Sequence, residues 1–185
     1  YRYVFGFLGI CLLVAPFGWH ILKPYQKDRL LVFLDPNIDP LGAGYTIIQS
    51  KIAIGSGQIF GKGWLSGTQN QLNFLPERHT DFIFSVIGEE WGLLGGLLLI
   101  YCYFRLINCG LDIAEQVKDK FGVLVTIGIV AILTLQVVIN VGMVMGLLPI
   151  VGLTLPFVSY GRTSFLIFII MMGFLLNLSK RRTIF

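Results

Sequence analysis

The seven residues PERHTDF, Pro76 to Phe82, place four ionisable side chains within five positions, directly before a long apolar run. The carboxylate among them that could do chemistry is Asp81, because a carboxylate can accept a proton from a hydroxyl as that hydroxyl attacks. Neighbouring cations can stabilise an anionic leaving group. A single well-placed carboxylate suits transfer from an activated donor better than hydrolysis by a carboxylate pair. The alternative is that Asp81 only caps a helix, which stabilises it by about 1 kcal/mol.

Two further acids, Glu89 and Glu90, lie inside the apolar run 82–104. If Thr80 is the N-cap of a helix there, one face about 100° wide carries small and polar residues about 12 Å inward. A charge at that depth is costly unless it faces protein or water, so we expect Glu89 to face a partner or a wet cavity and Glu90 to point away. A structural hydrogen bond between helices is the alternative role for both acids. The polar face consists of Asp81, Ser85, Gly88, Glu89 and Gly92.

The elements that must position these side chains are membrane spans. Of the 185 residues, 55% are hydrophobic and 13% charged, about half the charged fraction of a soluble domain. Runs of about 20 apolar residues predict an all-α polytopic membrane protein with spans near 3–22, 82–104, 121–148 and 155–178.

The first run lacks a small-residue cleavage pattern and is not expected to be a signal peptide. The chain, which begins at Tyr1, is expected to be a fragment. Three cysteines without CxxC spacing predict neither a disulfide framework nor a zinc site.

The loop 23–81 between the first two spans is too long and too patterned to be a passive connector. Apolar residues at helical spacing predict a helix over 40–54 that packs on the membrane domain. The glycine-rich run GSGQIFGKGWLSG follows, but Ser56 and Gly63 break phosphate-loop spacing. We therefore expect a tight turn and no nucleotide cofactor.

Orientation rests on the basic tail Lys180, Arg181 and Arg182, which places the C-terminus in the cytoplasm and the loop 23–81 outside. The balance is narrow, with seven basic residues inside and six in the outer loop. Binding an anionic, lipid-linked ligand would explain the outward cations, whereas the net charge of +4 gives no reason to expect nucleic acid. The side chains expected to bind such a substrate are Glu77, Arg78, His79, Lys51, Lys62, Ser85 and Glu89.

The later spans carry a few polar residues. Gln136 and Asn140 share one helix face, and hydrogen bonding between helices is their expected role. In PFVSYGRTSF, Ser159 and Thr163 are expected to share a face, and Arg162 is expected to lie at the outer boundary, where it can snorkel.

Three long motifs, in this order, carry a resemblance to a known family. They are DPLGAGYTIIQSKIAIGSGQIFGKGW, GTQNQLNFLPERHTDFIFSVIGEEWG and NVGMVMGLLPIVGLTLPFVSYGRTS. The chain resembles the C-terminal part of the shape, elongation, division and sporulation (SEDS) family over nearly its whole length. PERHTDF and DPLGAGY are more similar to the RodA branch than to the sister FtsW branch, which shares the HTDF core.

The resemblance implies a multi-pass enzyme of the bacterial inner membrane with about ten spans, which polymerises lipid II into glycan strands on the outer face for cell elongation and rod shape. It implies a class B penicillin-binding protein and other elongation-complex membrane proteins as partners. Asp81 matches the family's catalytic acid, and its helix N-terminus and Arg78 are expected to keep it ionised. A divalent cation is a candidate cofactor, with Asp81 as its candidate ligand.

Two departures and two alternatives accompany this resemblance. Arg162 stands where the family usually has the second glycine of SYGG, which predicts different packing of the fourth span. The four spans also lack the other wall of the cavity. A lipid II flippase would use Glu89 and the deep cavity more than Asp81, and a membrane scaffold of the elongation machinery would depend on neither acid.

Overall fold

The computed structural model describes residues 22–39, 42–71, 74–75, 77 and 79–181. Within these ranges every regular element is a helix. In chain order they are α2 (Pro24–Leu34), the 3-10 helix η1 (Pro36–Ile38), α3 (Ala43–Gly57), α4 (Thr68–Gln71), α5 (Ile83–Gln116), α6 (Lys120–Val144) and α7 (Arg162–Arg181). The span predicted over 3–22 lies outside the described residues.

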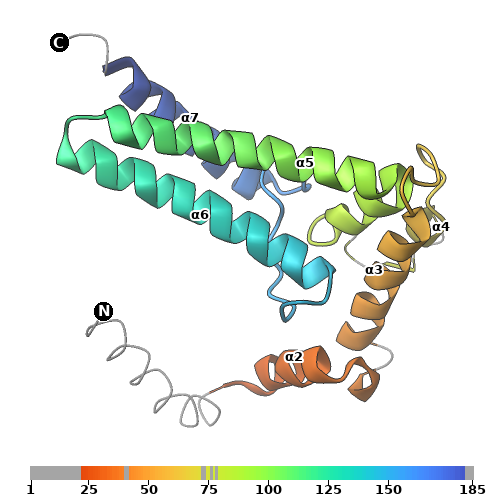
Figure 1. The fold of residues 1–185 in the computed structure, drawn as a ribbon. Coiled ribbons are helices and arrows are strands. Elements are labelled where there is room, and N and C mark those ends of the chain that lie inside the picture. The colour runs from red at the N-terminus through yellow and green to blue at the C-terminus, as the bar shows by residue number, and fades with distance from the viewer. Residues whose placement is uncertain (1–21, 40–41, 72–73, 76, 78, 182–185) are drawn as a thin grey trace.

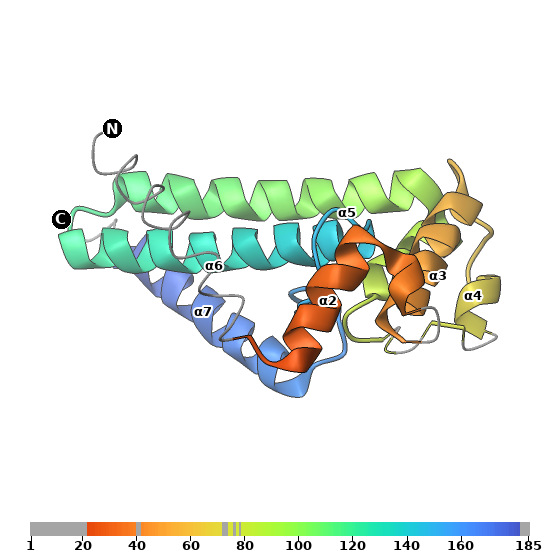
Figure 2. The ribbon, with the colours of Figure 1, turned by 90° about the horizontal axis from the view of Figure 1, so that it is seen from below.

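Helices α5 and α6 form a long antiparallel hairpin, and α7 packs obliquely against it (Figure 1). The short helices α2, α3 and α4 gather at one end of the hairpin (Figure 2). Three helices in the described part are long and apolar enough to cross a membrane: Ile83–Gln116, Lys120–Val144 and Arg162–Lys180. Large apolar side chains stay exposed along all three, such as Leu98, Leu135 and Leu166, which is the surface that lipid covers in a spanning helix.

The helix boundaries differ from the predicted spans. The helix that contains the span expected over 82–104 continues to Gln116. Its part after Phe104 contains more polar residues than the predicted span. The span expected from 155 begins instead at Arg162. Residues 155–160 are irregular, since Pro156 lacks a backbone donor and Phe157 has a positive φ of 63°. Ser159 therefore lies before the helix, and its expected pairing with Thr163 on one helix face was wrong.

The loop predicted to be structured contains α3, which covers the expected helix 40–54 from Ala43 onward. Its side chains Ile47 and Ala53 are buried, and the helix contacts α5 and α6. Ser50 donates a hydrogen bond of 2.7 Å to the carbonyl of Val144, and a Cβ on Gly57 would lie 1.9 Å from the carbonyl oxygen of Gly88. Glycine at this crossing allows α3 and α5 to approach closely.

Helix α5 breaks at Gly92, whose φ of 66° and ψ of −161° are non-helical. A break leaves carbonyl and amide groups without partners inside the helix. The glycine-rich turn supplies those partners: Lys62 N donates to Glu89 O at 3.0 Å, and Leu93 N donates to Gln58 O at 2.9 Å. The turn thus completes the hydrogen bonding of the broken helix.

The polar face expected on α5 is partly correct. Ser85, Gly88, Glu89 and Gly92 are all buried, as that face requires. The expected cap was wrong, because α5 begins at Ile83 with Phe82 as its N-cap and no side-chain cap bond. Glu90, which was expected to point away from that face, is also buried. A Cβ on Gly67 would lie 3.3 Å from Glu90 Cγ, so the returning loop covers this acid.

We predict that Gly92→Ala destabilises the protein. Its backbone conformation is one that essentially only glycine adopts, and such strain costs on the order of 1–3 kcal/mol. A Cβ there would also lie 2.3 Å from Gly61 N. Thermal unfolding of the full-length protein measures the effect. Gly55→Ala in α3 is the matched control: nothing lies within 4 Å of its Cβ, so stability should stay constant or rise. Equal melting temperatures for both variants would contradict the role of Gly92.

Candidate functional site

Asp81 lies in the turn that leads into α5, and other parts of the chain hold its backbone. Asn140 of α6 donates its side-chain amide to Asp81 O at 2.9 Å and to Leu153 O at 2.6 Å. Ser159 donates its hydroxyl to Thr80 O. These bonds use backbone oxygens and leave the Asp81 carboxylate available. Asn140 was predicted to bond between helices, but its partners lie instead in the Asp81 turn and the α6–α7 loop, which it joins.

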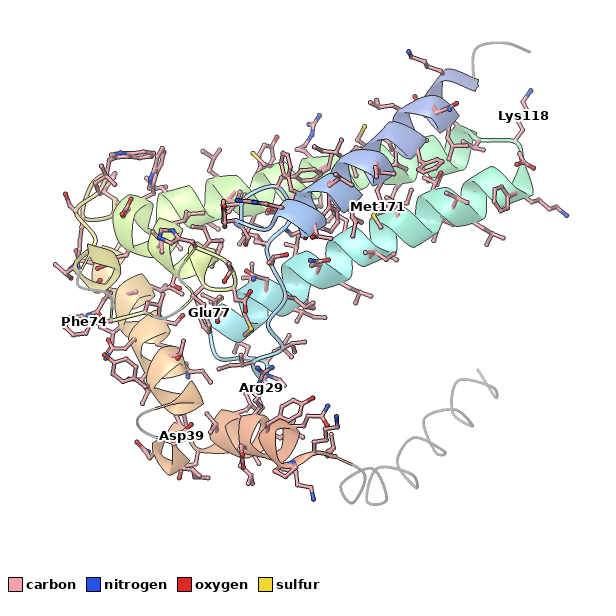
Figure 3. The ribbon with its side chains drawn as sticks, turned by 180° about the vertical axis from the view of Figure 1, so that it is seen from behind. Arg29, Asp39, Phe74, Glu77, Lys118 and Met171 are labelled. Carbon is pink, nitrogen blue, oxygen red and sulfur yellow. The ribbon has the colours of Figure 1, made fainter. Side chains whose placement is uncertain are left out.

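The same loop borders the carboxylate itself. A Cβ on Gly152, which has a φ of 78°, would lie 3.3 Å from Asp81 Oδ2. The neighbouring carbonyls of Ile150 and Val151 accept hydrogen bonds of 3.3 and 3.5 Å from Arg29 of α2. Figure 3 shows Arg29 projecting from α2 toward the segment that joins α6 and α7. Arg29 was one of the outward cations in the sequence, but no spacing signal linked it to Asp81.

The pKa of the Asp81 carboxyl is raised above its ordinary value, chiefly by burial and further by the charge of Glu77. Arg29 and a hydrogen bond with Thr80 lower the pKa in part. The reasoning that a helix N-terminus favours the ionised form was wrong, because α5 begins only at Ile83. A carboxylate with a raised pKa is a stronger base while it remains ionised near neutral pH.

The structure divides the predicted binding residues. Glu77 and His79 lie in the Asp81 turn and are exposed, and Tyr160 N donates to His79 O at 2.8 Å. Arg78 lies outside the described residues. Ser85 is fully buried and donates to Phe82 O at 2.7 Å, which leaves it unavailable to a ligand. Lys51, on α3, packs against the segment that follows α6: a Cβ on Gly146 would be 2.2 Å from Lys51 Cε.

The last two residues predicted to bind substrate, Lys62 and Glu89, bind one another. Lys62 Nζ lies 2.8 Å from Glu89 Oε1, with the Glu89 side chain 1% exposed. The same oxygen accepts bonds from the Thr68 hydroxyl at 3.2 Å and from Gln69 N at 3.1 Å. Glu89 Oε2 has no partner among the described residues and would lie 2.8 Å from a Cβ on Gly67. Glu89 therefore has the protein partner expected of it, and the pair fastens the outer loop to α5.

Metal binding at this site would rest on few ligands. In the described part of the chain no group of three His, Cys, Asp or Glu side chains is arranged to hold a metal ion. Asp81 and Glu77 are close enough for Glu77 to raise the pKa of Asp81. Two carboxylates with water at the other positions suit Mg²⁺, which retains several waters in proteins. Asp81 and Glu77 are the candidate ligands for a divalent cation at this site.

The family model for cell cycle proteins of the FtsW, RodA and SpoVE group matches residues 2–184. The chain belongs to this family. The family resemblance carried by the three sequence motifs is thereby confirmed, as is the all-helical membrane fold.

Several similar relatives are named peptidoglycan glycosyltransferases. The chain is 51% identical over 178 residues to the peptidoglycan glycosyltransferase MrdB of Escherichia coli K12, covering 95% of this chain and 48% of that protein. It is 43% identical to the peptidoglycan glycosyltransferase RodA of Treponema pallidum, covering 97% of this chain and 42% of RodA. The chain thus spans about half the length of the curated relatives it matches.

A solved structure extends the likeness to three dimensions. That structure carries the description "Structural coordination of polymerization and crosslinking by a peptidoglycan synthase complex". It matches with a TM-score of 0.78 and 33% identity, over 100% of this chain and 51% of that chain. The chain therefore shares its fold with about half of a chain in that structure.

We predict that Lys62→Met and Glu89→Gln each destabilise the full-length protein. Lys62→Met leaves the buried Glu89 carboxylate without its cation, and Glu89→Gln removes the charge that pairs with Lys62. Breaking a buried ion pair costs about 3–5 kcal/mol. Because the Lys62 side chain is 29% exposed, the loss of stability should lie near the lower end of this range. Unfolding of the single and double variants gives the coupling energy, and the double variant should lose less than the sum. Lys118→Met, at the far end of the α5–α6 hairpin, is the control. Additive losses would contradict the pairing.

Proposed function

We propose that this chain is the C-terminal half of a peptidoglycan glycosyltransferase that polymerises lipid II into glycan strands for cell elongation. The observation that carries the proposal is the Asp81 turn: its backbone is held by Asn140 and Ser159, and its carboxyl has a raised pKa. Its relatives named peptidoglycan glycosyltransferase support the same activity.

The reaction uses Asp81 as a general base. A sugar hydroxyl of one substrate attacks the anomeric carbon of the other, and its proton passes to the Asp81 carboxylate. A new glycosidic C–O bond forms while the bond from the anomeric carbon to the pyrophosphate oxygen breaks. The electron pair leaves with the polyprenyl pyrophosphate. Arg29, whose charge already acts on Asp81, supplies positive charge for the developing anion.

A divalent cation held by Asp81 and Glu77 would also supply positive charge for the leaving pyrophosphate. Glu77, like Asp81, lies in the described part of the turn before α5. The base role of Asp81 requires that the cation leave one carboxylate oxygen free to accept the proton.

The cellular setting follows from the same proposal. The protein would lie in the inner membrane of a bacterium, with the Asp81 turn and the outer loop on the extracytoplasmic side. Its partners would be a class B penicillin-binding protein, which cross-links the strands, and other membrane proteins of the elongation complex. The structurally similar synthase complex, described as coordinating polymerization and crosslinking, supports such a pairing.

A transport role receives less support. A flippase would depend on Glu89, yet this carboxylate is held by Lys62, Thr68 and the backbone of Gln69. Those contacts favour a structural role for Glu89. A pure scaffold would have no use for an acid with a raised pKa beside Gly152.

We predict that Asp81→Asn in the full-length protein lowers lipid II polymerisation by about 10²- to 10⁴-fold, the usual loss for a general base. Wild-type activity should fall as the pH drops through the raised pKa of Asp81. The stabilising contribution of a group with a raised folded pKa is lost as pH rises through that pKa, so the ionised form is destabilising. The melting temperature of Asp81→Asn near neutral pH should therefore equal or exceed that of the wild type.

Polymerisation is measured with the penicillin-binding partner at matched expression. Asp112→Asn, an exposed change toward the far end of α5, is the control and should keep wild-type activity. Near-wild-type polymer from folded Asp81→Asn protein would overturn the base assignment. Loss of polymer in Glu89→Gln but not in Asp81→Asn would instead place the chemistry deeper in the membrane.

Orientation has its own prediction. Ser66 is exposed in the loop before α4, so a cysteine there can react with a membrane-impermeant thiol reagent. In a full-length protein whose native cysteines have been replaced, Ser66→Cys should be labelled from outside intact spheroplasts, because the loop lies on the outer face. A cysteine at Lys118, in the α5–α6 connection, should react only after lysis. The reverse pattern would overturn the orientation.

A further inference from the structure

A groove of about 590 Å³ lies between the Asp81 turn and the start of α7. Its walls are apolar and are formed by Ile83, Phe157, Val158 and Phe165. One edge is polar, with His79 from the turn and Arg162 from α7. The volume lies within the roughly 300–1,000 Å³ typical of small-molecule sites. The groove therefore combines an apolar channel with a basic edge.

Phe157 shapes the apolar part of the groove. Its φ of 63° is unusual for a bulky residue. Its ring packs against Phe165 with 6.4 Å between centroids and against Phe168 with 5.6 Å. Strained backbone of this kind persists where the surrounding packing requires it and clusters at ligand sites. Phe165 also belongs to the exposed apolar face of α7, together with Leu166 and Ile169, so the groove is continuous with the lipid-facing surface.

Arg162 gives the edge its charge. It is the first residue of α7 and is exposed, and its hydrogen bond is a long one of 3.4 Å to the Tyr160 hydroxyl. No carboxylate among the described residues pairs with it. A guanidinium binds phosphate through two parallel hydrogen bonds, and the N-terminus of a 20-residue helix adds partial positive charge. The matching ligand is an anionic phosphate attached to an apolar chain.

The groove and the Asp81 turn are joined by direct bonds. Tyr160 N donates to His79 O at 2.8 Å, and Ser159 donates its hydroxyl to Thr80 O. Both donors also line the groove. A phosphate held at this edge would therefore keep a defined position relative to the catalytic turn.

We propose that this groove binds the polyprenyl pyrophosphate end of the lipid-linked substrate, with Arg162 as a phosphate ligand and the phenylalanine-lined channel as the seat of the first isoprene units. The proposal rests on the proposed function and assigns to Arg162 a role in the affinity for the carrier. Because the family usually has glycine at this position, the added cation is a feature of this chain.

The test measures binding to the full-length protein in nanodiscs, with polyprenyl pyrophosphate, phosphatidylglycerol and free inorganic pyrophosphate as separate probes. Arg162→Gln should lower the affinity for polyprenyl pyrophosphate by about 10-fold or more, as expected for a lost charged hydrogen bond. Arg162→Lys should restore part of it, because a lysine keeps the charge without the two-pronged geometry. Arg162→Gly, the usual family residue, guards against misfolding and should show the same loss.

Other outcomes would overturn the proposal. An equal loss for phosphatidylglycerol would make the groove a general anionic-lipid site, and equally tight binding of free pyrophosphate would remove the role of the apolar channel. Unchanged carrier affinity in Arg162→Gln would mean that another part of the full-length protein covers the groove. Polymerisation by Asp81→Asn at saturating lipid II tests the base assignment alone, so failure of the groove proposal and failure of the base assignment give different results.

Discussion

The fold depends most on one side-chain amide, that of Asn140, which bonds to Asp81 O and Leu153 O. Irregular backbone beside spanning helices must have hydrogen-bond partners, because an unsatisfied polar group in apolar surroundings costs several kcal/mol. Asn140 is fully buried and meets this need for two irregular segments at once. This contact joins the Asp81 turn to the loop that carries Gly152, and the bonds of Ser159 and Tyr160 join the groove before α7 to the same turn.

The same constraint explains the glycine-rich loop. The break at Gly92 frees backbone groups on both sides of the kink, and the returning turn bonds to them. Glycine is required where two backbones approach this closely, as at Gly61 and Gly92. A sequence that invites comparison with a phosphate-binding loop thus serves the hydrogen bonding of a helix. Lys62, carried on this loop, is bound to Glu89.

The site shows how stability and chemistry compete. Burial raises the pKa of Asp81, which makes its ionised form costly to the fold and makes it a better proton acceptor. Holding the turn through backbone oxygens leaves the carboxylate free for that role. Arg29, anchored on the carbonyls of Ile150 and Val151, offsets part of the cost with its positive charge. Proteins commonly retain such locally unfavourable groups at functional sites.

The sequence by itself determined the membrane class, the family and the helix after DPLGAGY, because these depend on composition, on sequence motifs and on spacing within one helix. Only the tertiary structure decided that Lys62 binds Glu89, that Arg29 acts on Asp81 and that Glu90 is buried. These contacts join residues distant in sequence or depend on the break at Gly92, which helical periodicity cannot predict. The start of α5 at Ile83 also escaped prediction, because contacts from α6 and the loop before α7 hold Thr80 and Asp81 in a turn.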